Sequence, residues 1–208
     1  LQEHSYFPPY RPSHQLVAST YDIHKKLVTS NYCSHTCTVE VAQAIFQIGK
    51  LMSAVKVFGK SGAELVTDSR NAASDPADYF DYIMFGWSNT TSGYRLAMER
   101  LLGRAPSEEE LQEKFIPGVS FHFLYEELIQ APGYMFDGYH VAKVRDSLDL
   151  NTFLHLCVIP SKDKSCFEGL IPCQLQDRVI YLDYEGEGLQ AWNTKVNQVL
   201  HGKDKLKE

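Results

Sequence analysis

The chain has 208 residues, of which 44% are hydrophobic and 22% are charged, and its formal net charge is −6. This composition is typical of a globular protein, and no apolar run approaches the roughly 18 residues of a membrane-spanning helix. A protein that binds nucleic acid mainly through the phosphates is normally basic or carries a dense basic stripe, and neither feature is present here. We therefore expect no membrane segment, and only a weak, local contact with nucleic acid.

The five cysteines are odd in number, and the chain shows no basic-then-apolar leader. An odd count without secretory features favours reduced thiols and a cytoplasmic location. The spacing of Cys33, His35 and Cys37 matches no standard zinc motif, and no second ligand pair follows at the usual distance. We expect no metal site.

The chain has no internal repeats and no low-complexity linker. Residues 1–30 are expected to form an irregular arm, rich in Pro, Tyr and His, and a short helix. Residues 31–200 are expected to form a single domain, and residues 201–208 a charged tail.

Residues 31–54 predict a strand, a polar corner at His35 and Thr36, an amphipathic helix and a second short strand. The helix has apolar residues at i, i+3, i+4 and i+7, which would form one buried face: Val41, Ala44, Ile45 and Ile48. Either Thr36 or Thr38 would cap its start, and Gly49 would end it with a positive φ. A polar pair at the mouth of a strand–helix corner is suited to gripping a small polar ligand.

Strands and helices then interleave without a regular βαβ rhythm, which favours an α+β fold over a doubly wound sheet. Residues 55–66 are expected to be a strand or extended loop, and residues 67–81 a polar loop. The expected strands are Tyr82–Trp87, Val119–Tyr125, Phe153–Ile159 and Val179–Tyr184; the expected helices are 93–104, one starting at Ser107, 163–169 and 188–200; residues 134–142 are expected to form a glycine-containing turn.

Four blocks of the chain carry a resemblance to a known family. They are Tyr32–Thr36 with the following helix and Gly49–Leu51, Asp68–Asn71 ahead of Asp78–Tyr82, the polar turn and helix start at Gly86–Arg95, and Tyr134–His140. In this order they resemble the ADP-ribosyltransferase fold, and specifically the DarT family, toxins that attach ADP-ribose from NAD to bases in DNA. The match extends over roughly residues 31–184.

The resemblance implies an α+β fold with a split mixed β-sheet and flanking helices, and an NAD-dependent transferase that modifies a macromolecular acceptor. NAD would be its substrate, a nucleic-acid base or a protein its acceptor, and an antidote protein a partner. Two alternatives stay open: a non-catalytic module that binds a nucleotide or a partner on the same scaffold, and an NAD glycohydrolase.

The resemblance also assigns site residues. His35, with Thr36 beside it, would contact NAD, and the Arg70 guanidinium would clamp its pyrophosphate. Three polar residues would line the nicotinamide pocket, and a fourth would position a base or sugar: Asn89, Thr90, Ser92 and His140. Each also has a purely structural interpretation, as a corner, ion-pair, turn or loop residue.

One departure from the family concerns the catalytic glutamate, which would fall near Thr152. ADP-ribosyl transfer passes through a cation-like ribose, which a carboxylate stabilises and a threonine does not. The chain offers Asp149 or the Glu185-Gly186-Glu187 pair as a replacement acid, although a helix cap or solvated turn would explain these acids equally well. If no acid replaces the glutamate, the reaction is lost or changed.

Overall fold

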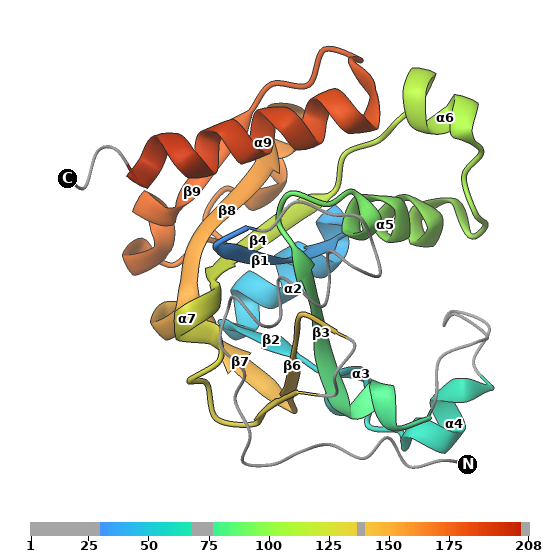
Figure 1. The fold of residues 1–208 in the computed structure, drawn as a ribbon, viewed down its shortest axis with the longest axis vertical. Helices are drawn as coiled ribbons and strands as arrows, with labels where there is room; N and C mark the ends of the chain where they lie inside the picture. The colour runs from blue at the N-terminus through green and yellow to red at the C-terminus, as the bar shows by residue number, and fades with distance from the viewer. Residues whose placement is uncertain (1–29, 68–76, 137–139, 205–208) are drawn as a thin grey trace.

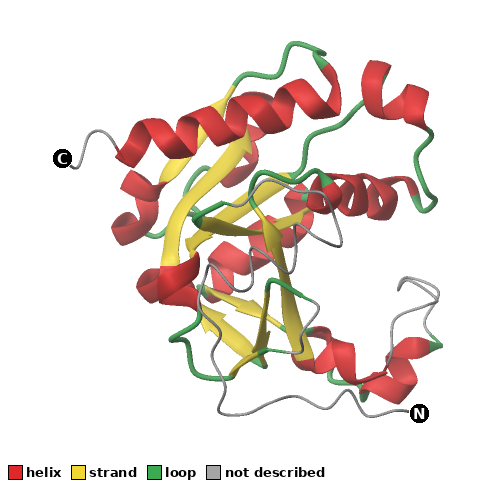
Figure 2. Ribbon diagram, in the orientation of Figure 1, coloured by secondary structure: helices red, strands yellow, loops and turns green. Residues whose placement is uncertain are grey.

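The computed structural model describes residues 30–67, 77–136 and 140–204. This part of the chain forms an α+β fold in which a seven-stranded sheet, ordered β5-β6-β3-β1-β4-β8-β9, is flanked by helices (Figures 1 and 2). Its strands are β1 (Tyr32–Cys37), β3 (Tyr82–Trp87), β4 (Val119–Leu124), β5 (Tyr134–Met135), β6 (Ala142–Arg145), β8 (Leu154–Pro160) and β9 (Val179–Leu182). The predicted α+β class is confirmed.

A second, two-stranded sheet pairs β2 (Lys50–Met52) with β7 (Ser147–Asp149). The α-helices are α2 (Val39–Ile48), α3 (Ala54–Phe58), α4 (Gly62–Val66), α5 (Ser92–Leu102), α6 (Glu108–Glu113), α7 (Tyr125–Leu128), α8 (Leu150–Phe153) and α9 (Gly188–Asp204). The 3-10 helices are η1 (Ala77–Asp81), η2 (Ser161–Phe167) and η3 (Cys173–Arg178). None of the helices in this part of the chain is long and apolar enough to cross a membrane.

The large sheet is antiparallel except for the parallel pair β8–β9. β1 pairs with β4 along its whole length, but it pairs with β3 only at Cys33 and Ser34. Beyond Ser34 the two strands separate. We call this place the β1–β3 split.

The two faces of the sheet bury separate hydrophobic cores because side chains alternate along each strand. One core joins Cys33 and Phe121 to the inner side of α2. The other joins Tyr32 and Val158 to α5, α6 and α9, and α9 lies along the β8–β9 end of the sheet (Figure 1). The strand–helix corner at His35 therefore lies between two packed layers.

Helix α2 begins and ends where the sequence predicts. Thr38 caps it by accepting a hydrogen bond from the Val41 N–H at 3.4 Å, and Gly49 ends it with a φ of 75°. The predicted buried face is wrong for three of its four residues. The helix buries Ala42, Ile45 and Phe46, whereas Val41 and Ile48 are 42% and 52% exposed and Ala44 is exposed too.

The reason is that α2 has a wide apolar surface: Glu40, Gln43 and Gln47 occupy one side, and the remaining apolar residues form two faces that compete for burial. The face that contains Phe46 buries the largest side chain of the helix. The Phe46 ring lies 5.4 Å from that of Phe121 and 5.9 Å from that of Phe167, centroid to centroid. Burying a ring of this size stabilises the fold more than burying Val41 or Ile48 would.

The expected strand or extended loop at 55–66 is also wrong, because the chain forms α3 and α4 there. Serine side chains cap both helices: Ser53 accepts from the Lys56 N–H, and Ser61 forms a reciprocal capping box with Glu64. Gly59 then ends α3 with a φ of 62°. These short-range signals outweigh the β-branched composition of the segment.

The strands and helices expected from residue 82 onward are present with shifts at their ends, whereas Ala77–Asp81, at the end of the expected polar loop, forms η1. The strand expected at Val119–Tyr125 ends at Leu124 because Tyr125 begins α7, and the strand expected at Phe153–Ile159 runs from Leu154 to Pro160. The turn expected at 134–142 contains the strand β5 and the start of β6. The helix expected within residues 15–30 and the loop that carries Arg70 lie outside the described residues.

Candidate functional site

The β1–β3 split leaves part of a strand edge without a partner. Tyr32 O accepts from the Ser88 N–H, so the main-chain groups of every second residue, through Ser34 to Thr36, point toward β3. The ladder stops at the Ser34–Gly86 pair. Thr36 therefore presents its N–H and C=O at the split, and no strand of the described chain lies opposite them.

At the split, the side chain of His35 makes a hydrogen bond to β3, whereas the main chain of Thr36 makes none. Its Nδ1 lies 3.3 Å from the Met84 carbonyl oxygen, on the strand that has moved away. Because a carbonyl oxygen can only accept, Nδ1 carries the proton and Nε2 has a lone pair. Within the described part of the chain, Nε2 has no hydrogen-bond partner.

The imidazole of His35 is neutral at physiological pH. The ring is half-buried and lies edge-on to Phe85, with 6.2 Å between ring centroids. Burial lowers the pKa of His35 to about 4; the bond to the Met84 carbonyl opposes this shift, and the charge of Arg100 adds to it. His35 is thus a fixed acceptor that suits a hydroxyl or amide donor.

Three hydroxyls gather where α5 begins, and we call Thr36, Thr90 and Ser92 the hydroxyl corner. A Cβ at Gly93 would lie 2.8 Å from Thr36 Oγ1, so only glycine lets the helix approach β1 this closely. The hydroxyls of Thr90 and Ser92 are 3.4 Å apart, and both would lie less than 4 Å from a Cβ at Gly86. The structure thus brings three of the predicted site residues together.

The start of α5 has open hydrogen-bond donors. Its N-cap residue, Thr91, makes no side-chain capping bond, so the first N–H groups of the helix lack a capping acceptor among the described residues. The turn before it is held by α9, since Asn193 Nδ2 donates to the Asn89 carbonyl at 3.1 Å. A positive helix end beside three hydroxyls suits an oxygen-rich anionic ligand.

His140 belongs to a separate aromatic cluster on the other side of β3. Its ring lies 5.1 Å from Tyr79, and the ammonium of Lys143 lies 4.8 Å and 4.3 Å from the ring centroids of Tyr79 and Tyr82. Lys143 is fully buried and pairs in register with Met84, whose carbonyl holds His35. The cluster therefore borders the split without entering the hydroxyl corner.

Sequence reasoning missed Lys143 because a lysine between Ala142 and Val144 looks like the outward residue of a half-buried strand. It also missed a buried polar chain below the hydroxyl corner. The His122 ring contacts Ser88 Oγ and Ser120 Oγ, each at 2.9 Å, and Tyr94 donates to Ser120 at 3.0 Å. A histidine between two buried phenylalanines was the signal that could have revealed it.

His122 positions the site rather than acting in it. It is 1% exposed, so no ligand reaches it. Burial, together with a smaller effect of the charge of His155, lowers its pKa to about 3. The neutral ring joins Ser88, at the start of the turn, to β4 and thereby fixes the approach of α5.

The carboxylates of two of the three candidate acids, Asp149 and Glu187, are engaged in local structure, whereas Glu185 is exposed. Asp149 is the N-cap of α8 and accepts from Thr152 N at 2.8 Å and Thr152 Oγ1 at 2.7 Å. Glu187 forms an ion pair with Lys195 at 3.2 Å and accepts from the Glu185 N–H at 2.7 Å. Asp149 lies in the two-stranded sheet, and the glutamates follow β9, which is separated from β1 by β4 and β8.

A hollow of about 350 Å³ opens along the last turns of α9, and none of the predicted site residues lines it. Its walls are Thr194, Asn197, Gln198, His201 and Gly202. Among residues 30–67, 77–136 and 140–204, no group of three His, Cys, Asp or Glu side chains is placed to hold a metal ion. All five cysteines fall in these ranges and are free thiols.

No protein-family model, curated protein or solved structure matches this chain. The geometry of the β1–β3 split and the hydroxyl corner therefore carries the functional argument.

Proposed function

We propose that this chain binds NAD at the β1–β3 split and transfers its ADP-ribose to a macromolecular acceptor, as the resemblance to the DarT-type ADP-ribosyltransferases implies. The observation that carries the proposal is the arrangement of His35 and Thr36. A neutral imidazole with an open acceptor nitrogen stands next to an unpaired piece of strand edge.

The edge at Thr36 is complementary to a carboxamide. A carboxamide has one N–H₂ donor and one C=O acceptor, and a residue at a free strand edge offers one C=O and one N–H on the same side. Nicotinamide carries such a group on a flat ring. Phe85, which lies edge-on to His35, is buried, so it supports the imidazole from behind and does not contact that ring.

The protein also offers binding groups for the ribose and phosphate parts of a dinucleotide. The Nε2 of His35 can accept a hydrogen bond from a ribose hydroxyl, and the hydroxyl corner offers further donors and acceptors. The open N–H groups at the start of α5 favour a phosphate. Arg70, which the resemblance assigns to the pyrophosphate, lies outside the described residues.

The state of the acids supports a second candidate, a module that binds the nucleotide without transferring it. Transfer needs a carboxylate near the developing ribose cation, and Asp149 and Glu187 are already bonded to Thr152 and Lys195.

The net charge of −6 weighs against a nucleic-acid acceptor that is bound through its phosphates. The candidate acceptors are therefore a single unpaired base and a protein side chain.

A binding assay followed by a transfer assay separates these functions. NAD that binds the folded protein raises its free energy of unfolding by RT ln(1 + [L]/Kd) and therefore its melting temperature, and labelled NAD with single-stranded DNA, RNA or lysate protein reports transfer. Label on an acceptor supports the transferase, whereas nicotinamide release without label supports hydrolysis. Binding without either supports the inert module, and no binding contradicts the proposal.

The binding should depend on His35 in particular. His35→Phe keeps an aromatic ring at the split but removes both ring nitrogens, so it should abolish the NAD-dependent rise in melting temperature. His201→Phe is the matched control on α9 and should leave that rise unchanged. Equal responses from the two variants would place NAD elsewhere.

A further inference from the structure

Helix α2 leaves an apolar stripe exposed. Val41 and Ile48 are 42% and 52% exposed, and Ala44 between them is exposed as well. The three residues are spaced i, i+3 and i+7, so they lie along one side of the helix. We call Val41, Ala44 and Ile48 the outer stripe. It belongs to the apolar face that the sequence predicts, and packing against the described part of the chain does not bury it.

The outer stripe is nearly symmetric about its centre. Ala44 has only a methyl side chain, and a branched aliphatic side chain lies about one turn away on each side of it. A small residue between two larger ones lets a second helix cross closely, with the larger side chains packed beside the crossing point. If that helix is a second copy of α2 that runs in the opposite direction, Val41 of each copy lies against Ile48 of the other.

The charges at the two ends of α2 favour the same antiparallel arrangement. Glu40 is exposed in the first turn of the helix, and Lys50 is exposed two residues after its last residue. Neither side chain forms an ion pair with another of the described residues. In two antiparallel copies, Glu40 of each approaches Lys50 of the other, and the two helix dipoles attract. A parallel pair would bring like charges together at both ends.

We infer that two copies of this chain associate through the outer stripe, as an antiparallel pair of α2 helices. A twofold axis beside Ala44 then places the same patch on both copies, which is the geometry of most homodimers. A partner of unrelated sequence would not require this symmetry of shape and charge.

The expected dimer is weak. Helix α2 has 10 residues and is therefore about 15 Å long, so the contact is small compared with a stable protein interface. The dimer should form only at high protein concentration. At low concentration the chain is a monomer, and the contact adds nothing to its free energy of unfolding.

Two glutamate variants of matched exposure test the place of the contact. Ile48 and Leu101 are 52% and 53% exposed, but Leu101 lies on α5. Sedimentation velocity over a wide range of concentration should show a dimer for the wild type and for Leu101→Glu. Ile48→Glu should raise the dissociation constant about tenfold or more, because it places a charge in the apolar contact. Thermal unfolding at low concentration checks that both variants are folded.

A charge exchange tests the antiparallel arrangement. Glu40→Lys and Lys50→Glu should each weaken the dimer, because either change brings like charges together at both ends of the helix pair. An equimolar mixture of the two variants should recover the dimer, because each end of the mixed pair again joins a lysine to a glutamate. Added salt should reduce these differences.

Three results would overturn the inference. The first is a wild-type protein that stays monomeric at its highest soluble concentration, which would leave the outer stripe to a different partner. The second is a dimer that Ile48→Glu and Leu101→Glu weaken equally. The third is a mixture of the charge variants that associates no better than either variant alone. Because NAD is absent from all of these measurements, their result is independent of the proposed function.

Discussion

Two histidines of this protein are held neutral by burial, and the difference between them lies in their partners. His122 has both ring nitrogens bonded to serines, so neither nitrogen is available to a ligand. His35 has one nitrogen on a carbonyl and the other open. A ring with an open, unprotonated nitrogen is able to bind a ligand, whereas a satisfied ring supports the structure.

Both histidines make stability depend on pH in a known direction. Their pKa values are about 4 and about 3 in the folded protein, below the usual 6.5, so the unfolded chain binds more protons as the pH falls below 6.5. The free energy of unfolding should therefore fall between pH 6.5 and pH 5, by up to about 1.4 kcal/mol per pH unit for each histidine. Urea unfolding at several pH values measures this slope.

A variant separates the contribution of His122 from the rest. His122→Asn removes one titrating group and keeps a polar side chain between Ser88 and Ser120, so its slope between pH 6.5 and pH 5 should be clearly smaller than that of the wild type. A variant with lower stability at every pH but the same slope would show that His122 is not the group that titrates.

At the scale of the elements, two variants test which face of α2 is buried. Phe46→Ala should lower the free energy of unfolding by about 3 to 5 kcal/mol, because it leaves a cavity between Phe121 and Phe167. Ile48→Ala should change the free energy of unfolding by about 0.5 kcal/mol or less, since Ile48 is 52% exposed. Chemical denaturation of both variants measures the difference, and similar losses would contradict the observed orientation of α2.

The contact between α5 and β1 depends on a single glycine. Gly93→Ala would place a Cβ 2.8 Å from Thr36 Oγ1, so the helix must shift, at a cost of about 1 to 3 kcal/mol in the free energy of unfolding. We expect the same variant to lose NAD binding because the hydroxyl corner opens. Thermal unfolding and an NAD titration measure the two effects.

Gly86→Ala is the matched control for that contact. Its Cβ would lie 3.6 Å from Thr90 Oγ1 and 3.7 Å from Ser92 Oγ, which are ordinary distances. It should therefore unfold at nearly the wild-type temperature. The double variant Gly93→Ala, Thr36→Ala should recover much of the stability lost by Gly93→Ala alone, and no recovery would show that the clash is not with Thr36.

At the scale of the whole molecule, local signals in the sequence predict individual elements well, but they do not predict how these elements pack against one another. The cap at Thr38, the stop at Gly49 and the strand at Tyr82–Trp87 are short-range features, and all three are confirmed. The buried face of α2 is not predictable in this way because the packing of Phe121 and Phe167, distant in the chain, decides it.

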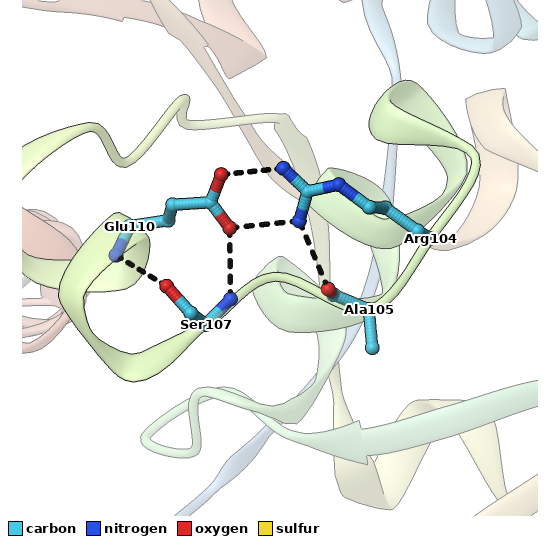
Figure 3. A network of polar contacts seen from close by, with 4 residues as sticks. All are labelled: Arg104, Ala105, Ser107 and Glu110. Atoms are coloured by element: carbon cyan, nitrogen blue, oxygen red, sulfur yellow. Dashed lines mark hydrogen bonds and ion pairs between the residues drawn. The ribbon is translucent and has the colours of Figure 1, made fainter.

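The candidate site shows the same contrast between local features, which are predictable, and long-range packing, which is not. The sequence pointed to His35, Thr36, Thr90 and Ser92 as polar residues at a corner and a turn, and the structure brings the last three together. It could not reveal that β3 leaves β1 after Ser34, nor that Arg104 pairs with Glu110 of α6 (Figure 3), because both facts depend on how separate elements of the chain pack. The DarT-type fold and its activity stay a proposal that rests on this geometry.

The central claim is that the open nitrogen of His35 accepts a hydrogen bond from bound NAD, and nitrogen NMR of the histidine rings tests it most directly. Free protein at pH 7 should show His35 as a neutral ring with the proton on Nδ1. Adding NAD should move the Nε2 signal of His35 in the direction expected for a new hydrogen bond, with the His201 signal unchanged. An unmoved His35 signal at saturating NAD would contradict the account.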